Sequence, residues 1–153
     1  MANVMGARAD GWWRDRAGAA LRLVREVQAL SRREDSPAGA WVLVLEGRAR
    51  DAAAMVLGDR AQGEGLPYVA PPGADWVPEV DDELSSVRVV SAPGVGDDAI
   101  VGAVAEAVAR EESCLVVTAD RELRRRCEEL NASVVGPGWL LRQLSPGKIT
   151  GTP

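Results

Sequence analysis

Four acidic residues stand where the sequence changes from one predicted element to the next. Glu46 directly follows an apolar run at residues 41–45. Asp97 and Asp98 open a helical pattern, and Asp120 opens another. In an α/β fold with parallel strands, the loops that leave the carboxyl ends of the strands gather at one edge, where ligands bind. We therefore expect three carboxylates to meet at one edge of a sheet, those of Glu46, of Asp97 or Asp98, and of Asp120.

Clustered carboxylates repel one another and need a counter-ion. Oxygen ligands alone select a hard cation, so an edge that gathers these side chains predicts a site for Mg²⁺ or Mn²⁺. A metal held in this way activates water and neutralises charge on a phosphate, which suits phosphodiester hydrolysis. The chain contains no histidine, which excludes Ser-His and Cys-His catalytic pairs and His-ligated zinc.

Two simpler interpretations compete with a metal site. Taken singly, an aspartate before a helix most often caps the free N–H groups of the first turn, as Asp97 and Asp120 could do. Glu46 could pair with Arg48 or Arg50 at the surface. The convergence of several carboxylates at one edge favours a functional role over separate caps.

The segment at residues 94–99 also matches the dinucleotide fingerprint G-x-G-x-x-G/A, between a predicted strand and a predicted helix. That fingerprint rests a pyrophosphate on a bare helix N-terminus. Here Asp97 and Asp98 occupy the helix start and would repel phosphates, while the helix dipole favours their own charge. We therefore expect no dinucleotide binding.

Hydrophobic periodicity predicts the elements that position these residues. Short apolar, β-branched runs indicate strands at residues 41–45, 87–91, 114–117 and 133–135. Helical spacing indicates helices at residues 13–33, 97–108, 121–130 and 137–144, and a short helix at 51–61. The stripes expected to be buried are Ile100, Val101, Val104 and Val108 in one helix, and Leu123, Cys127 and Leu130 in the next. This alternation predicts an α/β fold with a parallel sheet.

The length of 153 residues and the hydrophobic content of 46% suit one domain, which we place at residues 1–145, with a flexible tail at 146–153. Residues 3–6 are too few to form a strand. Residues 62–86 are rich in glycine and proline, end in an acidic patch and show no strand periodicity. We expect an irregular insertion there, either a flap beside the site or a surface loop without function.

Arginine dominates the basic residues, since only Lys148 of the 18 is a lysine. The arginines cluster at residues 14–25 and 121–126. Guanidinium forks bind phosphate in a bidentate way, so an acidic site rimmed by arginine could hold a polyanion despite the net charge of −5. The alternative is a solvated helix face with ion pairs such as Glu122 with Arg126.

Two tryptophans, Trp12 and Trp13, lie beside the first arginine cluster. We expect both to pack over the helix start, because tryptophan buries a large area wherever it can. The alternative is that they stack on nucleic-acid bases.

Two cysteines, Cys114 and Cys127, fall on a predicted strand and on the apolar stripe of a predicted helix, and their spacing matches no zinc motif. We interpret them as small core residues in a reduced, cytoplasmic setting. No apolar run approaches the ~18 residues of a membrane span, and no signal-peptide pattern is visible. We therefore expect no membrane contact. The sequence leaves open whether the protein is a monomer or a homodimer.

Three segments resemble NYN domains, especially the YacP-like branch of the PIN-like nuclease superfamily. They are GDDAIV at residues 96–101, LVVTADRELRRRC at 115–127 and the closing WLLRQL at 139–144. ANVMGAR at 2–8 and LVLEGRAR at 43–50 are similar to further parts of these domains, so the resemblance covers nearly the whole chain outside the insertion. It implies a three-layer Rossmann-like fold with a central parallel sheet. It also implies a metal-dependent endoribonuclease that acts on RNA with Mg²⁺ or Mn²⁺.

The resemblance further assigns roles to residues. It implies catalytic roles for Glu46, Asp97, Asp98 and Asp120, metal binding by Glu46, Asp97 and Asp120, and substrate binding by Asn3. The second arginine cluster adds Arg121, Arg124 and Arg125 as candidate substrate-binding residues. Domains of this family begin with a central apolar strand that ends in an aspartate shortly before the position of Asn3, and this sequence contains neither. We expect that strand to be encoded upstream of Met1.

Two other classes of protein stay open. One is a catalytically inactive RNA-binding or scaffold module of the same fold, because the aspartate of the first strand is absent. The other is a phosphoacceptor receiver-type domain, which also gathers aspartates at a sheet edge. A receiver needs a lysine after a late strand, whereas the only lysine here is Lys148 in the predicted tail.

Overall fold

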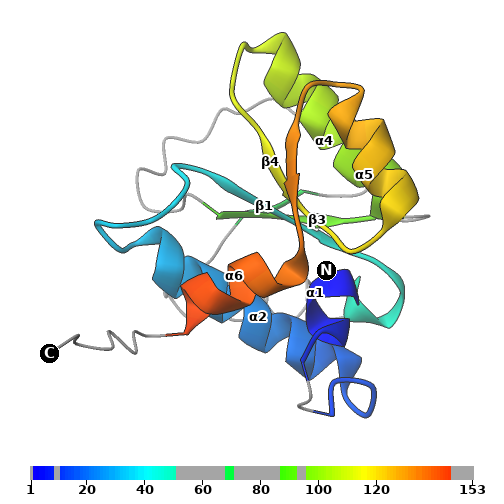
Figure 1. Cartoon of the computed structure of the whole chain (residues 1–153). Helices are drawn as coiled ribbons and strands as arrows, with labels where there is room; N and C mark the ends of the chain where they lie inside the picture. The colour runs from blue at the N-terminus through cyan, green and yellow to red at the C-terminus, as the bar shows by residue number, and fades with distance from the viewer. Residues whose placement is uncertain (1, 9–10, 51–67, 71–86, 93–95, 146–153) are drawn as a thin grey trace, which may run out of the picture.

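The computed structural model describes residues 2–8, 11–50, 68–70, 87–92 and 96–145 (Figure 1). Its elements are, in chain order, α1 (Ala2–Gly6), α2 (Arg16–Ser31), β1 (Trp41–Leu45), the 3₁₀ helix η1 (Gly47–Arg50), β2 (Tyr68–Ala70), β3 (Val87–Ser91), α4 (Gly96–Ala109), β4 (Leu115–Val117), α5 (Arg121–Glu128), β5 (Ser133–Val135) and α6 (Pro137–Leu144). The predicted helix at 51–61, most of the stretch at 62–86 and the predicted tail at 146–153 lie outside the described residues.

The described strands confirm an α/β fold, but they form two sheets. One sheet has three strands in the order β1-β3-β2, and the other consists of β4 and β5. The described pairings are all parallel, with Leu45 opposite Ser91 and Val117 opposite Val135 at the carboxyl ends. The single central sheet expected from the sequence is therefore not continuous within the described ranges. Apolar runs predict strands, but they do not say which strand edges pair.

β2 corrects the expectation that residues 62–86 contain no strand. It pairs in parallel with β3, with Val69 opposite Val89. Three residues between Pro67 and Pro71 are too few to show an alternating pattern in the sequence. A strand this short depends on pairing with its neighbour rather than on intrinsic propensity, and a sequence pattern does not reveal that pairing.

α2 packs one apolar face against β1 and β3. The face consists of Ala20, Leu23, Val24, Val27 and Leu30, all buried and at helical spacing. α1 and α6 contact α2, so Val4, Met5 and Leu140 join this first core cluster. Residues 3–6 are helical, and α6 begins at Pro137 as predicted. Figure 1 shows α1, α2 and α6 on one side of the three-stranded sheet and α4 and α5 on the other.

α2 begins later than the predicted residue 13, because Asp15 caps it. The Asp15 carboxylate accepts a hydrogen bond from Gly18 N at 2.8 Å. Trp12 packs against the first core cluster, as expected. The same expectation for Trp13 is wrong, since Trp13 is 57% exposed and meets the Trp12 ring edge to face.

α4, β4, α5 and β5 enclose a second core cluster. Its buried members are Val104, Val116, Leu123, Cys127 and Ala132, and partly buried residues such as Ile100, Val101 and Leu130 pack against them. Val108, predicted for the buried stripe, is 37% exposed, because the last turn of α4 extends beyond α5 (Figure 1). Both cysteines are unbridged members of this cluster, as predicted, and burial raises the pKa of each thiol.

Candidate functional site

The carboxyl ends of β1 and β3 bring two acidic segments together. The strands are parallel neighbours with Leu45 opposite Ser91, and Ala92 N donates a hydrogen bond to Leu45 O at 2.8 Å, so Glu46 and Ala92 leave the sheet side by side. Asp120 follows β4 in the second sheet and begins α5, which packs against α4. In Figure 1 the starts of α4 and α5 lie on the same side of the molecule, beyond the ends of β1 and β3. We name this region, formed by Glu46, Asp97, Asp98 and Asp120, the acidic edge.

Glu46 caps α4 across a long sequence separation. Its Oε2 atom accepts a hydrogen bond from Gly96 N at 3.0 Å. A Cβ atom at residue 96 would lie 2.7 Å from that oxygen, so glycine is what lets the carboxylate approach the helix start. This N–H is one that the dinucleotide fingerprint would offer to a phosphate. The alternative pairing of Glu46 with Arg48 or Arg50 involves side chains outside the description.

Asp120 is the N-cap of α5, as its position in the sequence predicts. Its Oδ1 atom accepts a hydrogen bond from Leu123 N at 2.9 Å. Its own backbone N–H donates to Thr118 Oγ1 at 3.0 Å, and Thr118 is buried. One carboxylate oxygen is thus committed to the helix. The other oxygen has no hydrogen-bond donor among the described residues.

Asp97 is the residue on which the charges of the acidic edge converge. It is half-buried, and burial is the largest cause that raises its pKa. The negative charges of Asp120 and then Glu46 raise the pKa further, whereas Arg126 opposes them. Asp97 is therefore close enough to Asp120 and to Glu46 to be repelled by both charges. Within the described part of the chain, no donor hydrogen-bonds to the Asp97 carboxylate.

Asp98 turns toward α5 rather than toward Glu46. Its Oδ1 atom accepts a hydrogen bond from Arg126 Nη2 at 2.8 Å, and this bond is the main cause that raises the pKa of Arg126. Asp98 is exposed, so the pair connects α4 to α5 at the surface. The sequence left open whether Asp97 or Asp98 joins the other carboxylates, and the geometry favours Asp97.

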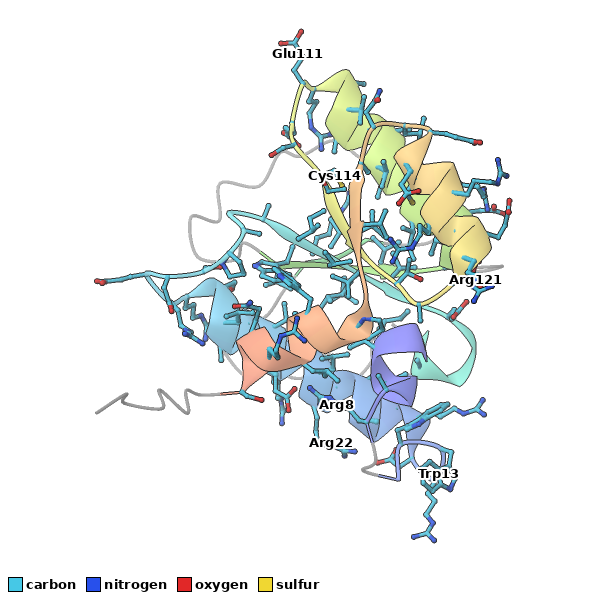
Figure 2. The ribbon with its side chains drawn as sticks, in the orientation of Figure 1. Arg8, Trp13, Arg22, Glu111, Cys114 and Arg121 are labelled. Carbon is cyan, nitrogen blue, oxygen red and sulfur yellow. The ribbon has the colours of Figure 1, made fainter. Side chains whose placement is uncertain are left out.

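The candidate substrate-binding arginines differ in how they are paired. Arg125 pairs with both Glu122 and Glu129, and Arg124 donates to Val134 O at 3.3 Å and approaches Glu128 at 3.5 Å. These pairs match the solvated helix face named as an alternative, but the expected pair of Glu122 with Arg126 is wrong, since Glu122 pairs with Arg125 and Arg126 pairs with Asp98. Arg121 at the start of α5 is exposed and has no acidic partner within ion-pair distance in the described ranges. Figure 2 shows Arg121 at the outer end of α5.

Asn3 lies in α1, and its side chain is outside the description. The structure places Glu46, Asp97, Asp98 and Asp120 in one region. The predicted role of Asn3 in substrate binding stays a prediction, because its side chain is not among those described.

The side chains of the acidic edge do not form a preorganised metal site among the described residues. Across the described ranges, no three side chains of histidine, cysteine, aspartate or glutamate form a group that could hold a metal ion. Glu46 and Asp120 each use one oxygen to accept a backbone N–H, which fixes the carboxylate and leaves its second oxygen without a hydrogen-bond partner in the described chain. The donor atoms therefore suit a hard cation chemically, and binding one would require the carboxylates to draw closer.

Three residues that shape the acidic edge were not predicted from the sequence. Gly96 admits the Glu46 carboxylate, Thr118 accepts from the backbone of Asp120, and Arg126 holds Asp98. The Thr118 contact has a local signal, because a threonine two residues before a helix cap commonly bonds to backbone in this way. The other two contacts join residues far apart in the sequence, so no local pattern indicates them.

None of the helices in the described part of the chain is long and apolar enough to cross a membrane. Comparisons of the chain with protein-family models, with curated proteins and with solved structures found no match.

Proposed function

We propose that the chain is a metal-dependent ribonuclease with a three-layer Rossmann-like fold of the PIN-like type. The observation that carries this proposal is the arrangement of Asp97 beside Glu46 and Asp120, at the carboxyl ends of parallel strands. Active sites of open α/β sheets lie at this edge. The raised pKa of Asp97 supports the same conclusion, because unpaired negative charge of this kind is what a bound cation neutralises.

The residues of the acidic edge have separate roles in this proposal. Glu46, Asp97 and Asp120 hold Mg²⁺ or Mn²⁺, and the ion supplies an activated water and neutralises charge on the phosphate. Glu46 and Asp120 are oriented by the backbone N–H groups of Gly96 and Leu123, so each presents one remaining oxygen. Asp98 acts through Arg126, a contact that fixes α4 relative to α5.

The proposed RNA-binding residues around the acidic edge are Asn3, Arg121, Arg124 and Arg125. Arg121 is favoured as a phosphate contact, because it stands beside the Asp120 cap with an exposed side chain. Arg124 and Arg125 would have to exchange a glutamate partner for a phosphate. Their contribution to RNA affinity is therefore expected to be smaller than that of Arg121.

The proposal is tested by cleavage of a 5′-labelled single-stranded RNA with Mg²⁺, with Mn²⁺ and with EDTA. Cleavage should require the metal. Asp97→Asn and Asp120→Asn should each remove most of the cleavage activity. An asparagine at 120 still accepts the cap hydrogen bond, so the folding stability should fall by no more than about 1 kcal/mol. Glu111→Gln, an exposed change beyond the far end of α4, is the matched control. Cleavage at the parental rate by both aspartate variants would refute the proposal.

A second candidate is a catalytically inactive RNA-binding module of the same fold. It is favoured by the absence of a closed three-carboxylate group within the described residues. The same assay separates the two candidates. An inactive module binds the RNA but leaves it intact with either metal, and its melting temperature does not rise when Mg²⁺ or Mn²⁺ is added.

A further inference from the structure

An exposed tryptophan stands at the end of the molecule that carries the start of α2. Trp13 is 57% exposed, whereas its neighbour Trp12 packs against the first core cluster. The two rings meet edge to face, with centroids 6.4 Å apart and planes at 86°. The Arg16 guanidinium lies 5.6 Å from the centroid of the Trp12 ring. Trp12 is thus anchored on both sides and supports the Trp13 ring, which remains accessible to a ligand.

Arginines are frequent in the sequence on both sides of Trp13. Residues 8–25 contain five arginines and two aspartates, in a chain whose net charge is −5. Arg14 and Arg16 are exposed, and the side chain of Arg22 is 54% exposed, with Asp15 no closer than 4.0 Å. Figure 2 shows Trp13 and Arg22 at the same end of the molecule. We name the surface formed by Trp13, Arg14, Arg16 and Arg22 the Trp13 face.

Stability of the local fold does not explain this composition. Arg14 and Arg16 stand at the positive end of the α2 dipole, where a cation is unfavourable, and the first turn of α2 contains no acidic residue. Asp15 already caps the helix through Gly18 N. Arg8, by contrast, has a structural role, since it forms an ion pair with Glu26. Arg14, which has no ion pair in the described chain, and Arg22, whose carboxylate partner Asp15 is 4.0 Å away, are therefore available for an anionic ligand.

The chemistry of the face fits one class of ligand. An aromatic ring offers a stacking platform for a base, and guanidinium groups beside it bind the flanking phosphates. Bases are free to stack on a side chain in a single strand, whereas a duplex keeps them paired. We infer that the Trp13 face binds single-stranded RNA, with a base stacked on Trp13 and phosphates held by Arg14 and Arg22. The choice of RNA as the polyanion rests on the proposed function.

RNA bound at the Trp13 face would extend the substrate path beyond the acidic edge. Arg121 and Trp13 both lie on the right-hand side of the view in Figure 2, with Arg121 above and Trp13 below. An RNA strand bound at the Trp13 face would therefore be presented to the acidic edge from the α1–α2 side.

The test measures binding of a fluorescein-labelled single-stranded RNA to the full chain by fluorescence anisotropy, in EDTA. Trp13→Ala should weaken binding between about fivefold and about 150-fold, the range that one base stacked on an aromatic ring supplies. Trp13→Phe keeps a ring and should lose less. Because Trp13 is 57% exposed, the melting temperature of Trp13→Phe should match the parent, and that of Trp13→Ala should fall only slightly, through loss of the edge-to-face contact with Trp12.

The phosphate contacts are tested through the salt dependence. Removing Arg14 and Arg22 together by Arg→Ala changes should lower the slope of log affinity against log salt by about 1.4, which corresponds to two single-strand phosphate contacts. Arg33→Ala with Arg142→Ala is the control, because it removes the same formal charge from two exposed side chains, one beyond the C-terminal end of α2 and paired with Asp35, the other in α6. The control should leave the slope unchanged.

Several results would overturn the inference. They are an unchanged affinity in Trp13→Ala, an equal loss of slope in the control pair, and binding of duplex RNA as tightly as single strands. Displacement of the RNA by polyglutamate at equal charge would point instead to an acidic protein partner and would also overturn it. Binding is measured without metal, so the result does not depend on cleavage. A parent that cleaves RNA while Trp13→Ala binds normally would refute this inference and leave the proposed function standing.

Discussion

Replacing Gly96 by alanine tests the contact on which the acidic edge depends. The added Cβ would lie 2.7 Å from Glu46 Oε2 and 3.1 Å from its carboxyl carbon. The end of a glutamate side chain can swing away at little cost, so the expected damage is the loss of the hydrogen bond from Gly96 N rather than lasting steric strain. A hydrogen bond to a charged group contributes about 1.5–3 kcal/mol.

An opposing effect reduces that loss. Alanine is more favourable than glycine in a helix by up to about 1 kcal/mol. The contact is partly solvent-exposed, so the lower end of the hydrogen-bond range applies, and the net destabilisation should be about 1 kcal/mol. Gly102→Ala is the control within the same helix, because nothing lies within 4 Å of the Cβ position there. It should stabilise the fold by about 0.5–1 kcal/mol.

The two variants should therefore differ by about 2 kcal/mol, or about 4–8 °C in melting temperature for a chain of this size. Thermal melts followed by circular dichroism measure the difference directly. If both alanine variants melted above the parent by the same amount, Glu46 would not occupy the start of α4, and the arrangement of the acidic edge would be wrong.

Three further outcomes are expected. Asp97→Asn should be more stable than the parent at neutral pH, because the raised pKa of Asp97 means that the parent loses folding stability as this carboxyl ionises with rising pH. Thermal melts across pH measure the difference. The advantage of the variant should vanish at acidic pH, where Asp97 of the parent is protonated. Thr118→Val should cost about 1–3 kcal/mol in urea unfolding, because the backbone N–H of Asp120 loses its acceptor; an unchanged midpoint would contradict this. Leu123→Ala should cost about 2–5 kcal/mol, because Leu123 is fully buried in the second core cluster, and a smaller loss would mean that the cluster is loosely packed.

Much of the fold could be predicted from local patterns. The strands at 41–45, 87–91 and 133–135 and the helix at 137–144 have the predicted bounds, because apolar runs, turn residues and Pro137 are signals carried by the elements themselves. The division into two sheets could not be predicted in this way. It depends on which strand edges meet, and the apolar runs of β1 and β4 are compatible with either arrangement.

Some features of the acidic edge could likewise be predicted from local patterns, and others could not. Asp120 could be predicted as a cap, because an aspartate before a helical pattern accepts a first-turn N–H in most proteins. The choice between Asp97 and Asp98 required the rotational phase of α4, since neighbouring residues on a helix point in different directions. In the structure Asp98 pairs with Arg126, 28 positions along the chain, whereas the charges of Asp120 and Glu46 act on Asp97.

The presence of two core clusters bears on how the protein opens. Glu46 follows β1 of the first cluster, whereas Asp97 and Asp120 stand on helices of the second. The described polar links between the clusters include the Glu46 contact with Gly96 and the approach of Arg88 to Glu106 at 3.9 Å. Units of this kind can open independently, so amide hydrogen exchange should reveal two cooperative steps of different free energy. Opening of either unit would dismantle the acidic edge while most backbone hydrogen bonds of the other stayed protected, so loss of the site should precede global unfolding.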